Sequence, residues 1–313
     1  MHVQSTLYPS ILSRLLQGFS VFCALMILAR FINPQSVAAE NREPAILVIG
    51  GSYGNGSPPF NDRLVAPFGG IAVGFGSYLS LGSALTRSRE GPGFVINQAE
   101  AGATTFSRLW CVADQCGPAG WHGHPEQLSE ALHRVAVVDP EDPSKILYYN
   151  AQYLVVSLTV DCLHSDAFGI PQSQTEPCGA DEMNGYIERL LATADTALEL
   201  GIRPVFTKMP EYRNLDLPMT RERFGLLWVI DEPDYNTLKN LHEQSLENKA
   251  GVLLVEAWRG FRHLGDGLHP TPATVEVAAR RIMRKIRSDR YCNSNRSLQP
   301  QAKSNEVMDI CRS

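Results

Sequence analysis

The sequence has no excess of basic residues. Lys and Arg number 28 against 33 Asp and Glu, which gives a formal net charge of −5. The first 39 residues contain two arginines, Arg14 and Arg30, and no acid, so the rest of the chain carries 26 basic against 33 acidic residues, a net charge of −7. Sequence-independent binding to a phosphate backbone needs concentrated positive charge. The sequence therefore argues against a nucleic-acid partner.

The sequence also lacks a long apolar run. The run over residues 15–29 is shorter than the roughly 20 residues that a membrane-spanning helix needs. Arg14 precedes it, and the small residues at 36–39 follow it. This order is typical of a secretory signal, which we predict over residues 1–39. An uncleaved N-terminal anchor is the alternative, and it would be the chain's only link to a membrane. Both interpretations place the body of the protein outside the cytoplasm, either secreted or periplasmic.

No Cys-x-x-Cys motif occurs, which argues against a zinc site. Apart from Cys23 in the apolar run, the chain has six cysteines, an even number that suits disulfides in an oxidising compartment. Of about 15 pairings, pairing between neighbours is the simplest, and free thiols are the alternative. The expected disulfides are Cys111–Cys116, Cys162–Cys178 and Cys292–Cys311. The last would close a polar tail, 289–313, that follows a domain over 40–288.

No internal repeat is visible, but five short apolar runs recur along the domain, at 45–50, 93–97, 153–158, 202–207 and 251–256. They are continuously apolar and rich in β-branched residues, as in parallel strands covered on both faces. Helical patterns separate them: one opens at Asp181 and ends at Gly201, one covers 233–248, and the last begins at Thr271 and Pro272. This alternation predicts an open, doubly wound α/β sheet.

The first predicted strand runs into a Gly-rich turn, Gly-Gly-Ser-Tyr-Gly-Asn-Gly at 50–56. The turn lacks the glycine order of a dinucleotide loop and the lysine of a P-loop. A structural turn is one explanation. A nucleophilic serine, Ser52, at the carboxyl edge of the sheet is the other, because sites in such sheets form at that edge.

A second motif supports the nucleophile. Asp266 and His269 lie three residues apart, between the fifth strand and the last helix. A serine hydroxyl needs a general base, and a histidine base needs a carboxylate to hold its tautomer. An aspartate three residues before a histidine is common by chance. The position of this pair between the fifth strand and the last helix is what makes it a specific signal.

With these motifs the chain resembles the SGNH/GDSL hydrolase family over residues 44–288. Ser52 matches the family's nucleophile, and Asp266 and His269 match the last conserved block. The segment from Val95 to Thr105 matches the second block, with Gly102 at the position of the oxyanion donor. The resemblance implies a three-layer α/β/α sandwich with a five-stranded parallel, flavodoxin-like sheet. It also implies an oxyanion hole formed by the backbone N–H groups of Ser52 and Gly102.

Two positions depart from the family pattern. Gly51 replaces the aspartate that precedes the nucleophile, which we expect to be tolerated. In the third block, Asp161 or Val160 occupies the place of the asparagine that donates to the oxyanion. An ionised Asp161 would repel an oxyanion, so we expect it to be protonated through burial or to point away.

Several other side chains are weaker candidates. Trp110 and Trp121 are candidates for substrate stacking, although ordinary packing explains them equally well. His122 and His124 are expected in a surface loop rather than at a metal, and for Cys162, His164 and Asp166 the Cys162–Cys178 disulfide is favoured over a metal. No metal or cofactor is expected.

The sequence thus predicts an exported serine hydrolase of carboxylic esters, acting on a small-molecule, glycan or lipid ester, with an acylated polysaccharide as one candidate. A non-catalytic binder of acylated glycans and an O-acyltransferase are the alternatives. The oligomeric state is left open.

Overall fold

The structure is a computed structural model that describes residues 43–55, 79–88, 94–112 and 114–298. The expected signal segment 1–39, Cys311 and the end of the expected tail lie outside the described residues. The central sheet has five parallel strands in the order β2-β1-β7-β8-β9. Each overlaps one of the five predicted runs. Their bounds are β1 Ala45–Ile49, β2 Val95–Asn97, β7 Ala151–Val156, β8 Arg203–Thr207 and β9 Leu253–Val255.

The apolar runs are continuous because both faces of the sheet are covered. Every residue of β1 is buried, and successive side chains point to opposite faces. Leu47 and Ile49 belong to one hydrophobic cluster, whereas Ile46 and Val48 belong to the other. The predicted three-layer arrangement is therefore confirmed.

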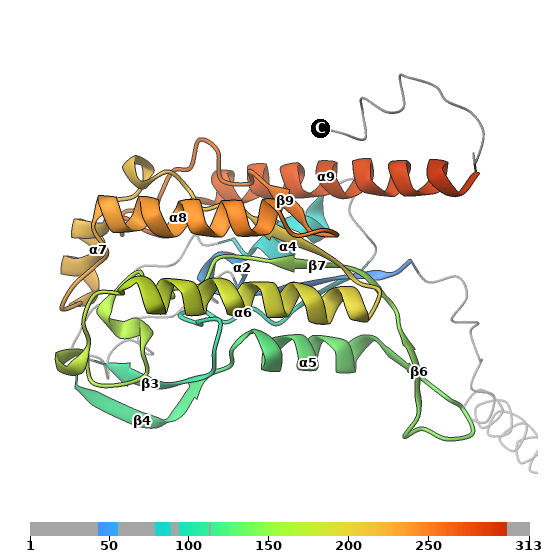
Figure 1. Ribbon diagram of the computed structural model, residues 1–313, viewed down its shortest axis with the longest axis horizontal. Helices are drawn as coiled ribbons and strands as arrows, with labels where there is room; N and C mark the ends of the chain where they lie inside the picture. The colour runs from blue at the N-terminus through green and yellow to red at the C-terminus, as the bar shows by residue number, and fades with distance from the viewer. Residues whose placement is uncertain (1–42, 56–78, 89–93, 113, 299–313) are drawn as a thin grey trace, which may run out of the picture. The chain divides into compact units, whose positions relative to one another are not determined.

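Helices form the two outer layers (Figure 1). The cluster on one face takes side chains from α5 His124–Val135, α6 Ala180–Glu199 and α8 Glu232–Glu247. The cluster on the other face takes them from α4 Leu81–Arg87 and α9 Pro272–Leu298. Two more helices lie near the carboxyl edge of the sheet, α2 Ser52–Asn55 and α7 Leu217–Phe224.

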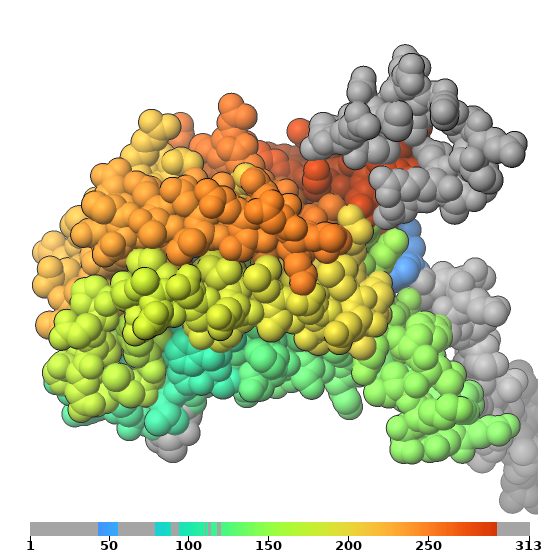
Figure 2. Space-filling model, viewed as in Figure 1, coloured from blue at the N-terminus to red at the C-terminus, as the bar shows by residue number. Residues whose placement is uncertain are grey.

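Two antiparallel hairpins were not predicted. One pairs β3 Arg108–Val112 with β4 Gln115–Trp121. The other pairs β5 Ala136–Val138 with β6 Ile146–Tyr149 and leaves the body of the molecule between α5 and β7 (Figure 1). The second hairpin exposes apolar side chains, since Ile146 and Leu147 are about half exposed. In the space-filling view it forms the projecting light-green part beside α6 (Figure 2).

Two of the expected cysteine pairings are present as disulfides, Cys111–Cys116 and Cys162–Cys178. Cys292 lies in α9, and its expected partner Cys311 is outside the described residues. Helix α9 continues to Leu298, beyond residue 288, where the domain was expected to end. None of the described helices is long and apolar enough to span a membrane.

Candidate active site

Ser52 is placed by a tight turn at the carboxyl end of β1. Gly50 has φ +119°, and a Cβ at this position would lie 2.3 Å from the Ser157 carbonyl oxygen. A Cβ at Gly51 would lie 2.6 Å from the Leu158 carbonyl oxygen. The backbone of the neighbouring strand's extension therefore leaves no room for a side chain at either position. This backbone has no space at Gly51 for the aspartate that the family resemblance implied there. Ser52 itself begins α2 and is largely buried.

Side-chain hydrogen bonds from Asn55, Asn97 and Gln127 brace this turn. Asn97 Nδ2 donates to the Gly54 carbonyl at 2.9 Å, and Asn55 Nδ2 donates to the Ala99 carbonyl at 2.6 Å. The Gly50 N–H donates to Gln127 Oε1 at 2.7 Å. Sequence reasoning missed Gln127, which belongs to α5 and lies 77 positions away. These contacts fix the second-block segment and the serine turn against each other.

Asp266 and His269 are brought together as their spacing predicted. His269 Nδ1 lies 2.7 Å from Asp266 Oδ2. Asp266 Oδ1 accepts the backbone N–H groups of Leu268 and His269, each at 3.0 Å. Burial by itself favours the protonated acid, yet these hydrogen bonds and the nearby His269 hold the pKa of Asp266 below its ordinary value. The carboxylate is thus ionised and fixed in orientation.

The loop that carries these two residues needs a glycine. Gly267 has φ +82°, and a Cβ there would lie 2.1 Å from the Asp216 carbonyl oxygen. The hydroxyl of Thr220, in α7, donates to the Asp266 carbonyl at 2.9 Å. Helix α7 therefore supports the Asp266–His269 loop from one side.

The loop and the serine turn meet through Tyr53. Its hydroxyl donates to the Leu268 carbonyl at 2.7 Å, across 215 positions of sequence. Ser52, Tyr53 and Leu268 also line one small cavity, of about 20 Å³. The three residues expected to form a triad thus lie on two segments that are joined directly.

Gly102 lies in a second glycine turn, which follows β2. It has φ +86°, and a Cβ there would lie 3.2 Å from the Trp121 ring. Arg108 Nη2 donates to the Gly102 carbonyl at 2.7 Å, and the Arg108 guanidinium lies 4.3 Å from the centre of the Trp121 ring. Trp121, for which substrate stacking and ordinary packing were both open, packs on Gly102 and Arg108. The side chain of Trp110 is not among those described.

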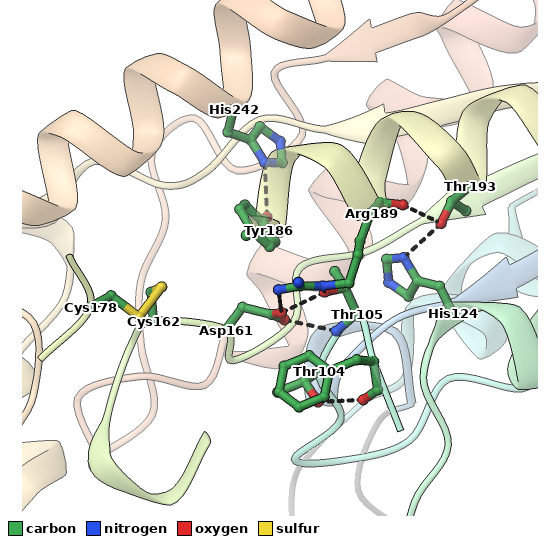
Figure 3. Close-up of polar contacts among 11 residues, drawn as sticks. Thr104, Thr105, His124, Asp161, Cys162, Cys178, Tyr186, Arg189, Thr193 and His242 are labelled. Atoms are coloured by element: carbon green, nitrogen blue, oxygen red, sulfur yellow. Dashed lines mark hydrogen bonds and ion pairs between the residues drawn. A yellow bond between two sulfur atoms is a disulfide. The ribbon is translucent and has the colours of Figure 1, made fainter. Parts of the chain in front are cut away.

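The carboxylate of Asp161 is turned away from a donor role (Figure 3). It accepts the Thr105 N–H at 2.9 Å and the Thr105 hydroxyl at 2.5 Å, and it pairs with Arg189 Nη2 at 3.4 Å. A carboxylate that accepts from three donors cannot donate to an oxyanion. Val160, the other candidate, has an apolar side chain, and its N–H donates to the Ala103 carbonyl at 3.1 Å. Neither Asp161 nor Val160 therefore offers a side-chain hydrogen-bond donor to an oxyanion.

The predicted surface loop at 122–124 is confirmed for His122 and wrong for His124. His122 is exposed and lies 2.7 Å from Glu100, but His124 is completely buried at the start of α5. His124 opens α5, and Pro125 at the first turn of this helix was the sequence signal that was overlooked. Among the described residues, no group of three or more His, Cys, Asp or Glu is placed to hold a metal ion.

His164 and Asp166, which were considered as metal ligands from the sequence, have strongly shifted pKa values. Burial raises the pKa of Asp166 to about 6, although Arg108 opposes this shift. Burial likewise lowers the pKa of His164 to about 3, and the charges of Arg108 and His269 act in the same direction. Cys162, the third member of the set considered for a metal, is in its disulfide with Cys178.

Comparison with known proteins gives structural matches only. No family model and no curated protein matches the sequence. A GDSL-like lipase from Bacteroides thetaiotaomicron is 12% identical, with 83% of this chain and 97% of that chain covered and a TM-score of 0.41. An acetylxylan esterase from Geobacillus stearothermophilus is 11% identical, with 78% and 94% covered and a TM-score of 0.41.

A further solved structure aligns with a TM-score of 0.51 at 14% identity, covering 78% of this chain and 97% of that chain. At such identities a likeness concerns the fold alone. The parallel five-stranded sheet and the hydrophobic clusters on its two faces give the three-layer α/β/α fold that the sequence predicted.

Proposed function

We propose that the protein is an exported hydrolase of carboxylic esters that uses Ser52 as nucleophile, His269 as general base and Asp266 as the carboxylate that orients the base. The observation that supports this most strongly is the 2.7 Å contact between His269 Nδ1 and Asp266 Oδ2. It lies on a loop tied to the Ser52 turn by Tyr53. Such a pair is what a serine needs in order to become a nucleophile.

The contact determines which nitrogen of His269 can act. The ionised Asp266 accepts, so Nδ1 carries the proton and Nε2 keeps its lone pair. Nε2 takes the proton of Ser52 as the serine oxygen attacks the ester carbonyl, and gives it to the departing alcohol. Water activated by the same nitrogen then releases the acid from the acyl-serine. Asp266 stabilises the imidazolium that forms at each step.

The negative oxygen of each tetrahedral intermediate is bound by backbone donors. We assign this role to the backbone N–H groups of Ser52 and Gly102. Asp161 takes no part in it. Each preorganised donor of this kind contributes about 2.7–4 kcal/mol to transition-state stabilisation. Arg108, which donates to the Gly102 carbonyl, and Asp161, which binds Thr105, hold the turn from its two ends.

Two independent features support export. The predicted signal at 1–39 directs the chain out of the cytoplasm, and the Cys111–Cys116 and Cys162–Cys178 disulfides are compatible with an oxidising compartment.

The test uses purified protein and a fluorophosphonate probe, which labels an activated serine, together with p-nitrophenyl esters from acetate to palmitate and an acetylated polysaccharide. We expect labelling at Ser52 and turnover of at least one ester, both lost in Ser52→Ala and His269→Ala. Ser83→Ala is the matched control, because Ser83 is an exposed serine of α4. Wild-type turnover in Ser52→Ala would refute the proposal.

A further inference from the structure

The chain turns back sharply over residues 160–163, after β7. The Leu163 N–H donates to the Val160 carbonyl at 3.0 Å, which closes a four-residue turn. Cys162 is the third residue of this turn and has φ +60°. No other residue except glycine has a positive φ in the part of the chain that the structure describes. A positive φ at this place in a turn favours glycine or asparagine, so a cysteine there is strained.

A disulfide ties this strained residue to α6. The partner of Cys162 is Cys178, which directly precedes the N-cap of that helix. Arg189, further along α6, pairs with Asp161 at 3.4 Å, and its Nε donates to the Thr105 hydroxyl at 2.6 Å. Helix α6 is thus attached to the 160–163 turn twice, by a covalent bond and by an ion pair (Figure 3).

The turn bears on the proposed site through what it binds. The carboxylate of Asp161 accepts both the N–H and the hydroxyl of Thr105. The preceding N–H of the turn donates to the Ala103 carbonyl at 3.1 Å. These contacts fix the segment that follows Gly102, whose N–H we assign to the oxyanion. A change in the backbone at Cys162 therefore moves its direct neighbour Asp161 and, with it, this segment.

Two roles of the bridge can be told apart at Cys162. Closing a loop of 16 positions constrains the unfolded chain, which raises stability whatever the conformation of the turn. Holding φ at +60° is a separate effect on the folded protein, because a residue with a Cβ otherwise favours a negative φ. Glycine adopts a positive φ readily. Cys162→Gly therefore gives up the bridge but keeps the turn, whereas Cys162→Ala gives up both.

We propose that Cys162 is a positioning residue for the oxyanion hole. Its disulfide with Cys178 holds the 160–163 turn in the conformation in which Asp161 binds Thr105. The effect on catalysis rests on the proposed hydrolysis, whereas the placement of Thr105 does not.

The test compares kcat and KM of full-chain variants for a p-nitrophenyl ester. Complete loss of one oxyanion donor lowers kcat about 10²–10³-fold. In Cys162→Ala, Cys178→Ala the donor is displaced rather than removed, so we expect kcat to fall at least about tenfold with KM unchanged. Cys162→Gly, Cys178→Ala lacks the same bridge but should keep kcat within about twofold of wild type. Cys111→Ala, Cys116→Ala, which removes the other described bridge, is the control and should leave kcat unchanged.

Amide hydrogen exchange over residues 102–107 gives a readout that needs no catalysis. We expect faster exchange than wild type in the Cys162→Ala, Cys178→Ala variant and wild-type exchange in the Cys162→Gly, Cys178→Ala variant. If the wild-type protein turns over no ester, this exchange pattern still supports the positioning role, and the proposed hydrolysis alone fails.

Two results overturn the inference. Equal exchange and equal kcat in the glycine and alanine variants would mean that the bridge acts through stability alone. Failure of both variants to fold, shown by circular dichroism, would mean that the whole domain depends on the bridge rather than this turn.

Discussion

The hydroxyl of Tyr53 donates to the carbonyl oxygen of Leu268 at 2.7 Å. Each partner is the chain neighbour of a proposed catalytic residue, Ser52 and His269 respectively. The Tyr53 ring is itself packed between Trp258, at 5.0 Å between ring centres, and Phe261, at 5.7 Å. A single buried side chain thus sets the distance between the nucleophile turn and the base loop.

Tyr53→Phe tests this positioning role. The substitution keeps the ring packing and removes a hydrogen bond that contributes about 1 kcal/mol. If that energy serves positioning, kcat for a p-nitrophenyl ester falls about fivefold while KM is unchanged. The control is Tyr153→Phe, which removes a buried hydroxyl that donates to Asp289 at 3.0 Å. It should lower stability similarly but leave kcat at the wild-type value. Equal kcat values in the two variants would assign Tyr53 a purely structural role.

Asp161→Asn tests the buried ion pair. The asparagine leaves Arg189 without its carboxylate and offers Thr105 one acceptor oxygen instead of two. Hydrogen bonds to charged groups contribute about 1.5–3 kcal/mol, so we expect the melting temperature to fall by several degrees. We also expect kcat to fall, because Thr105 closes the turn that begins at Gly102.

A double-mutant cycle with Arg189→Met checks that the two charges act together. Their stability effects should be clearly non-additive, as for residues in one network. Additive effects, or an Asp161→Asn variant with wild-type stability and kcat, would show that the ion pair contributes nothing.

Acid should destabilise the fold between about pH 6.5 and 4. Burial lowers the pKa of His124 and His242 to about 4 and that of His164 to about 3. These histidines stay neutral when folded, whereas in the unfolded chain they take up protons below their ordinary pKa of about 6.5. Falling pH therefore favours the unfolded state across this window.

The urea concentration at the midpoint of unfolding, measured at intervals from pH 7.5 to 4, gives the slope of stability against pH. His242→Gln should flatten it, because His242 is buried between Tyr186 and the Thr207 carbonyl. His133→Gln, at an exposed position of α5, should leave the slope as it is. A midpoint independent of pH over this range would mean that these rings are accessible to protons in the folded protein.

The disulfides should contribute unequally to stability. Cys162 and Cys178 are 16 positions apart, which corresponds to about 3 kcal/mol on the chain-entropy model. Cys111 and Cys116 are only 5 apart and close a smaller loop. We therefore expect a larger fall in the guanidinium midpoint for the Cys162→Ser, Cys178→Ser pair than for Cys111→Ser, Cys116→Ser. Peptide mapping without reductant should recover both bridges, and their absence from protein made in an oxidising compartment would contradict the pairing.

The sequence predicted those parts of the fold that depend on local pattern. The five strands were found because a buried parallel strand has to be apolar at every position, as β1 is. Asp266 and His269 were found because their contact spans three positions. The β3–β4 hairpin was missed because its second strand, Gln-Cys-Gly-Pro-Ala-Gly-Trp, has neither alternation nor β-branched residues.

The contacts around Asp161 could not be predicted from the sequence. Its partners Thr105 and Arg189 lie 56 and 28 positions away and come from different segments. Nothing near Asp161 in the sequence distinguishes a carboxylate that accepts from three donors from one that faces the oxyanion. The burial of His124 was hidden for the same reason, because its partner Thr193 lies 69 positions away, in α6.

The strand order β2-β1-β7-β8-β9 has a consequence for how the chain folds. The first strand lies inside the sheet, and its second neighbour, β7, begins about 100 residues later. Most of the pairings that bury β1 are therefore distant in sequence, and a topology rich in such contacts folds slowly. Until β7 docks, one edge of β1 and its apolar face are open to other chains, which favours aggregation. Recovery of the Tyr53–Leu268 contact should accordingly be among the last events of refolding, so regained activity would report the completed fold rather than its early collapse.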